Sequence, residues 1–207
     1  MVRRTRDDAV ATRARILDSA QQLMHQRGLH CVTLEDVARA IGMTRGAVYA
    51  HFRSRAALLG ALLSCAEADF AARLAPLADG KRARPGALEP ALAALLDGDA
   101  IARHVSLLVA LLQHKCCTAC ELCPLRERVL TGIDRLRGAC ADLLPEPALA
   151  GLLLAHLWGL LSAHALQLTS AGLSGAAPAL ATLYLGAGVQ HGASVRQDAP
   201  ECIRDTP

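Results

Sequence analysis

Apolar residues in the first third of the chain recur at the spacing of an amphipathic helix. Between Asp8 and Arg27 this apolar face consists of Ile16, Leu17, Ala20, Leu23 and Met24. Asp7 and Asp8 suit the positive start of such a helix, and Gly28 permits the left-handed backbone that ends one. The pattern therefore predicts a helix over about 8–27.

Two shorter helices are predicted directly afterwards. Thr33 is a natural N-cap, and Asp36 stands three residues later, which is a capping box with Asp in place of Glu. Gly42 permits a turn, Thr44 caps the next helix, and that helix ends near Tyr49. Two short helices joined by a glycine-containing turn, after a longer bracing helix, indicate a helix-turn-helix whose second helix lies in the major groove.

The rest of the chain also follows a helical period. Further helices are predicted over about 91–96, 101–112, 124–144, 147–170 and 178–191. No run of alternating β-branched and aromatic residues stands between turn signals. The fold class is therefore all-α, with an N-terminal three-helix helix-turn-helix domain and a C-terminal helical domain for ligand binding and dimerisation.

Charge is distributed unevenly between these two parts. Residues 1–65 hold 10 Lys and Arg against 5 Asp and Glu, whereas 66–207 hold 12 against 14. A basic module on a slightly acidic body suggests binding of a polyanion, although a solvated basic face is the simpler alternative. We take 1–65 as a DNA-binding domain and 66–207 as an effector-binding and dimerisation domain.

Side chains suited to DNA gather around the second short helix. Arg45 can pair with guanine O6 and N7, and Thr44 can bond a base edge or a phosphate. Phosphate contacts are predicted for Tyr49, Arg53 and Arg55, and a basic arm for Arg3, Arg4 and Arg6. The alternative is a small helical bundle with ordinary surface arginines.

The stretch "TRARILDSAQQLMHQRGLHCVTLEDVARAIGMTRGAVYAHFRSRAALLGALL", residues 12–63, closely resembles the DNA-binding domain of the TetR/AcrR family of bacterial repressors. The resemblance implies an all-helical homodimer that binds double-stranded operator DNA and whose larger domain binds a small effector. By position in the motif it implies DNA contacts for Thr33, Thr44, Arg45, Gly46, Tyr49, His51 and Arg55.

The last two predicted helices are almost entirely small or aliphatic. Their apolar surface exceeds what one side of a monomer leaves exposed, which favours a two-fold dimer interface over burial within one chain. Residues 148–168 have the length of a membrane span, but interspersed His, Ser and Gln and the lack of flanking basic clusters favour a buried bundle helix. The charged N-terminus indicates a cytoplasmic protein without membrane partners.

Four of the eight cysteines fall within "HKCCTACELCPLRERV", residues 114–129, where "HKC…PLRER" resembles an AcrR-like subgroup. Closely spaced thiols suit a soft metal or metalloid effector such as As(III), Zn(II) or Cu(I). A complete site would draw further ligands from elsewhere, for instance His104 or Cys140. The predicted metal ligands are Cys116, Cys117, Cys120 and Cys123.

Three alternatives for these thiols stay open. A redox or electrophile sensor would use Cys123, whose pKa the following helix and Arg126 would lower. An iron–sulfur cluster is disfavoured because Glu127 stands where the next ligand is needed. The third alternative is that the cysteines simply pack as small apolar side chains.

An effector of another kind, an apolar drug or metabolite inducing an efflux system, is the alternative to a metal. Its candidate pocket residues are His104, His114, His156 and Trp158, although aromatics make up only 2% of the chain. No motif of an enzyme occurs, and no cofactor is required. The sequence thus predicts a DNA-binding repressor that is not an enzyme.

Overall fold

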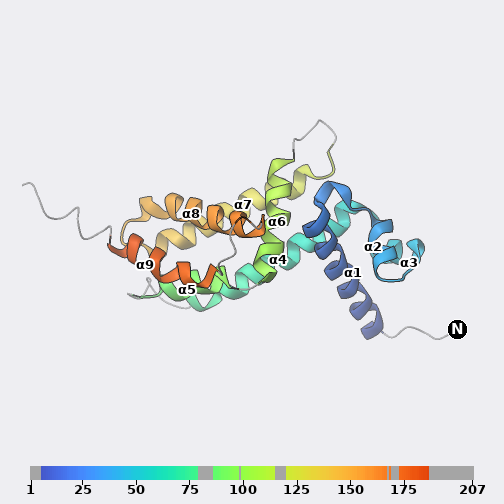
Figure 1. Ribbon diagram of the computed structural model, residues 1–207, viewed down its shortest axis with the longest axis horizontal. Helices are drawn as coiled ribbons and strands as arrows, with labels where there is room; N and C mark the ends of the chain where they lie inside the picture. Colours follow the sequence, from blue (N-terminus) through green and yellow to red (C-terminus); the bar gives the residue numbers. More distant parts are fainter. Residues whose placement is uncertain are drawn as a thin grey trace, which may run out of the picture.

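A computed structural model describes residues 6–78, 86–97, 99–114, 120–166, 168 and 173–186. Throughout these ranges the chain forms helices and no strand, which confirms the all-α prediction. The molecule is elongated, with α1, α2 and α3 gathered at one end and α5, α8 and α9 at the other (Figure 1).

The N-terminal end consists of α1 (Arg6–Arg27), the 3-10 turn η1 (Leu29–Cys31), α2 (Leu34–Ala40) and α3 (Arg45–His51). We call these elements the head. Asp7 and Asp8 lie in the first turn of α1, as predicted, and Gly28 after its end has a φ of 84°. Gly42 in the turn between α2 and α3 has a φ of 66°, a backbone conformation that glycine adopts without steric cost.

The C-terminal part, which we call the body, contains the remaining helices. They are α5 (Leu88–Leu96), α6 (Asp99–Gln113), α7 (Cys123–Leu143), α8 (Ala150–Ala165) and α9 (Ala176–Gly186), with short 3-10 turns at Pro147–Leu149 (η2) and Leu173–Gly175 (η3). Pro124 lies in the first turn of α7, where its missing N–H costs no intrahelical bond.

One long helix, α4 (Arg55–Ala78), connects the head to the body (Figure 1). Leu58, Leu59, Leu62 and Leu63 belong to a core shared with the head, whereas Phe70 and Leu74 pack against the core of the body. The boundary that we placed at 65/66 from the sequence therefore falls inside a continuous helix.

The core of the head is not built from the head alone. It contains Ile16, Val37, Val48 and Phe52 and also five residues of α6, α7 and the turn between them: Leu107, Leu111, Leu122, Leu125 and Val129. The second core joins α5, α6, α7, α8 and α9. We call the first cluster the shared core, because both parts of the chain supply it.

Several large apolar side chains stay exposed in the body. Leu152, Leu166, Leu168 and Leu183 are each more than half exposed. The segment Pro147–Ala165 is long and apolar enough to cross a membrane, and 22% of that window is buried. The chain itself thus leaves much of this helix uncovered, contrary to full burial within one bundle.

We expect Leu59→Ala to destabilise the protein by about 2–5 kcal/mol, since Leu59 is fully buried in the shared core and truncation leaves a cavity. Urea unfolding at a fixed protein concentration measures the change. Val10→Ala on the exposed side of α1 is the control, with an expected change within about 0.5 kcal/mol. Equal effects of the two substitutions would contradict the assignment of the core.

Candidate nucleic-acid interface and thiol site

Reciprocal hydrogen bonds fix the start of α2. The amide of Asp36 donates to Thr33 Oγ1 at 3.2 Å, and the amide of Thr33 donates to Asp36 Oδ2 at 3.0 Å, which confirms the predicted capping box. The hydroxyl and then the amide of Thr33 lower the pKa of Asp36 below its usual range. The cap therefore holds α2 in place at neutral pH with its carboxylate charged.

The second short helix begins at a similar cap and buries one face. The amide of Ala47 donates to Thr44 Oγ1 at 3.2 Å, as predicted. Val48 is fully buried, whereas Thr44, Arg45 and Gly46 are exposed. α3 thus presents its first turn outward and anchors itself through its middle.

Glu35 of α2 organises the exposed face of α3. Its Oε1 lies 2.9 Å from Arg45 Nε and accepts a longer bond, 3.5 Å, from the hydroxyl of Tyr49. The Arg45 guanidinium also stands over the Tyr49 ring, 5.1 Å from its centroid. Arg45 and Tyr49, both predicted to contact DNA, are therefore held together by Glu35, for which the sequence predicted no role.

The remaining predicted DNA contacts differ in their surroundings. Arg53 is exposed directly after α3, while His51 is half-buried and its carbonyl accepts a bond of 3.5 Å from Arg13 Nη1. Arg55 donates through Nη2 to the carbonyl of Leu29. Arg55 therefore ties α4 to η1 within the chain, a role that the sequence did not reveal.

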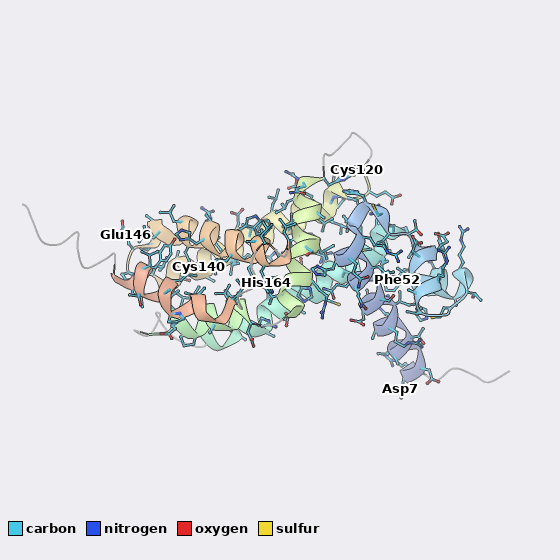
Figure 2. The ribbon with its side chains drawn as sticks, in the orientation of Figure 1. Asp7, Phe52, Cys120, Cys140, Glu146 and His164 are labelled. Atoms are coloured by element: carbon cyan, nitrogen blue, oxygen red, sulfur yellow. The ribbon has the colours of Figure 1, made fainter. Side chains whose placement is uncertain are left out.

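A thiol and two imidazoles meet where α6 ends and α7 begins. His114 Nε2 lies 2.8 Å from Cys120 Sγ, and the amide of Leu122 donates to the same sulfur at 3.4 Å. The ring of His114 stacks on that of His30 in η1, with centroids 5.7 Å apart and planes inclined by 28°. Cys120 thus lies beside the head (Figure 2).

These contacts lower the pKa of the Cys120 thiol to about 7. The amide of Leu122 contributes most, and hydrogen bonds from His114 and Cys123 act in the same direction against partial burial. The sequence favours Cys123 as the acidic thiol. In the structure the pKa of Cys120 is lowered, because its sulfur receives the backbone amide of Leu122.

The predicted metal ligands are only partly represented. Cys116 and Cys117 lie outside the described residues, and within the described part no three His, Cys, Asp or Glu residues are grouped to hold a metal ion. Cys140 is buried in the core of the body, where burial raises its pKa to about 11 (Figure 2). Within the described residues Cys140 and His104 are not grouped with Cys120 and Cys123, and the four-cysteine site stays a prediction.

His104 instead connects three helices. Gln21 Nε2 of α1 lies 2.8 Å from its Nδ1, and Asp69 Oδ2 of α4 lies 3.5 Å from its Nε2. The amide nitrogen of Gln21 can only donate, which places the ring proton of His104 on Nε2, toward Asp69. Burial lowers the pKa of His104; Asp69 opposes this effect, and Arg103 and Arg73 add to it.

The other predicted pocket residues bind different partners. His156 Nδ1 lies 2.6 Å from the hydroxyl of Tyr184 in α9, His114 pairs with Cys120, and Trp158 is half-buried on α8. Cavities of about 370 and 10 Å³ are lined by residues of the head, α4 and α6 and by none of the four predicted ones. The three histidines thus have separate partners, and a pocket shared by all four residues stays a prediction.

The capped helix-turn-helix with an exposed arginine on its second helix has the form of a DNA-reading head. A family model for bacterial regulatory proteins of the tetR family matches residues 16–62. This match and the similarity to the regulators TtgR and AcrR identify the N-terminal part of the chain as a DNA-binding domain of the TetR/AcrR type.

Similarity to individual relatives is strongest in the head. The HTH-type transcriptional regulator TtgR of Pseudomonas putida is 48% identical over 63 residues, which is 30% of each chain. The repressor BepR of Brucella suis biovar 1 is 28% identical over 146 residues, 69% of this chain and 66% of BepR. The chain thus spans about a third of the length of the first curated relatives that it matches.

Solved structures agree over most of the fold. The SmeT–triclosan complex has a TM-score of 0.65 at 23% identity, covering 94% of this chain and all of SmeT. NalD, the secondary repressor of the MexAB-OprM multidrug efflux pump in Pseudomonas aeruginosa, has a TM-score of 0.61 at 24% identity, covering 87% and 96%. At this identity the agreement concerns the fold.

His104 makes the stability of the protein depend on pH. Its folded pKa is lowered, so the unfolded chain binds the proton first, and stability decreases as pH falls below about 6.5. We expect the melting temperature to fall more between about pH 7.5 and pH 5.5 in the wild type than in His104→Gln, whose amide does not titrate. Parallel melting profiles for the two proteins would contradict this role of His104.

Proposed function

We propose that the protein is a transcriptional repressor that binds a near-palindromic operator as a homodimer and is released by an effector acting on the body. The observation that carries the proposal is the exposed Arg45, held by Glu35 beside Tyr49 on α3. A fixed, outward arginine on the second helix of a helix-turn-helix suits recognition of a base edge.

The ion pair with Glu35 leaves the terminal amino groups of Arg45 available as hydrogen-bond donors. The pair uses Nε, whereas a guanine edge can accept from the terminal amino groups at O6 and N7. Because Glu35 and Tyr49 limit the side chain's freedom before binding, less conformational entropy is lost on contact with DNA. The other proposed DNA contacts, which position the head on phosphates, are Thr33, Thr44, Gly46, Tyr49, His51, Arg53 and, from the start of α4, Arg55.

The exposed leucines of the body support the homodimer. Leu152 of α8 and Leu183 of α9 are 60% and 54% exposed, and Leu166 and Leu168 follow α8. Apolar surface of this kind favours association, and two-fold pairing of identical faces would place two heads on two half-sites. A near-palindromic operator follows from that symmetry.

For the effector we propose a thiophilic metal or metalloid at the cysteine cluster. Its described part, Cys120 with His114 and Cys123, lies at the junction of head and body, where a bound ligand affects both. The second candidate is an apolar compound that induces an efflux system. NalD's description as an efflux-pump repressor and the complex of SmeT with triclosan support it by analogy of fold.

We expect Arg45→Ala to weaken operator binding by about 1–3 kcal/mol, the usual contribution of one bidentate base contact, with little effect on random DNA. Fluorescence anisotropy at fixed salt measures both affinities. Arg137→Ala is the matched control, since Arg137 is an exposed arginine in a similar ion pair on α7. Unchanged discrimination between operator and random DNA in Arg45→Ala would exclude base reading by Arg45.

The dimer is tested with Leu152→Asp and Leu183→Asp together. We expect a folded monomer in sedimentation velocity and a loss of operator affinity, because charge on an interface core opposes its burial. Val10→Asp, which charges an exposed position on α1, is expected to leave the sedimentation coefficient unchanged. A dimeric double variant would show that another surface forms the dimer.

A further inference from the structure

Cys120 and Cys123 lie within one turn at the start of α7. The amide of Cys123 donates to the carbonyl of Cys120 at 3.3 Å, and this turn brings the two side chains to the same place. The Cys123 thiol hydrogen-bonds the sulfur of Cys120, and neither residue is in a disulfide. The two sulfurs are therefore already neighbours before any ligand arrives.

A base stands on the other side of Cys120. His114 Nε2, 2.8 Å from the sulfur, can accept the thiol proton, and the Leu122 amide at 3.4 Å stabilises a thiolate. Cys120 is half-buried and packs against the shared core. The arrangement combines a nucleophilic thiol, a second thiol and a proton acceptor.

The number of sulfurs selects the ligand. Two neighbouring sulfurs in one turn can both bond a single thiophilic atom. An arsenic atom that carries one organic substituent needs two sulfurs only. We propose that Cys120 and Cys123 form a dithiol site that captures a monosubstituted trivalent arsenical.

The capture requires no oxidant. R–As(OH)₂ and two thiols give R–As(S–Cys)₂ and two waters: two As–O bonds break and two As–S bonds form. Each thiol proton leaves with one hydroxide as water. The proton of the Cys120 thiol passes through His114. Arsenic stays trivalent and both sulfurs keep their oxidation state. The second bond forms within the protein, so the pair retains arsenic far more strongly than one thiol does.

Capture also changes the contact between body and head. A sulfur bonded to arsenic carries no proton and little charge, so it no longer holds His114 as a thiol or thiolate does. His114 stacks on His30, and η1 with His30 leads directly into the cap of α2 at Thr33. This consequence for DNA rests on the proposed repressor function, whereas the capture itself does not.

The test uses phenylarsine oxide, the anhydrous form of such an arsenical, on the full-length protein. Intact-mass analysis is expected to find one phenylarsenic group per chain on the wild type. Cys120→Ser and Cys123→Ser are each expected to bind at least about 100-fold more weakly, measured by competition with a small dithiol, because the chelate is lost. Circular dichroism verifies that both variants are folded.

Two further variants serve as matched controls. Cys31→Ser with Cys65→Ser removes two exposed thiols, and Cys116→Ser with Cys117→Ser removes the neighbouring pair; both proteins are expected to retain full capture. Unchanged affinity in Cys120→Ser or Cys123→Ser overturns the proposal. Loss of capture in Cys116→Ser with Cys117→Ser overturns it too, because the site would then be the other pair.

Operator release is measured separately on the same proteins. We expect phenylarsine oxide to release wild-type protein from operator DNA and to leave Cys123→Ser bound. Capture without release would overturn the link to DNA, while the dithiol site would stand. Failure to recognise any operator, before the arsenical is added, would instead contradict the proposed repressor function and leave the mass measurement intact.

Discussion

Burial of Leu107, Leu111 and Leu122 against the helices of the head is the interaction on which the rest of the structure depends. The head is small, and its own apolar side chains form only part of the core in which they are buried. The end of α6 and the start of α7 supply the missing apolar surface, and the long α4 fixes them in register. Because the same leucines stabilise both parts, a shift of the α6–α7 junction alters the packing of the head.

Polar contacts repeat this coupling around the shared core. Gln21 of α1 bonds His104 of α6, and His25 of α1 lies 3.0 Å from Ser106 Oγ. Within the body, Arg73 of α4 donates to the carbonyls of Ala94 and Asp97. Each bond joins segments far apart in sequence. A half-buried polar contact that loses its partner costs free energy, so head and body are favoured to move in discrete steps.

Local features of the sequence were sufficient to predict the helix-turn-helix. Thr33, Asp36 and Thr44 act on residues three positions away, and the predicted caps are confirmed. The contacts that specify the site are not local: Glu35 reaches Arg45 from a neighbouring helix, and Arg55 bonds Leu29 across 26 positions. A periodic pattern carries no information about such pairs. For the same reason, the sequence grouped three histidines that the structure joins to separate partners: His104, His114 and His156.

Cys120 and Cys123 differ from the other described cysteines in their position in the fold. Free cysteines commonly pack as small apolar side chains, and Cys140 in the core of the body does so, with a pKa raised by burial. Cys120 differs in having an amide, an imidazole and a second thiol directed at one sulfur. It also lies at the edge of the shared core, two residues before Leu122. Cys120 and Cys123 therefore lie where side chains of α6 and α7 complete the core of the head.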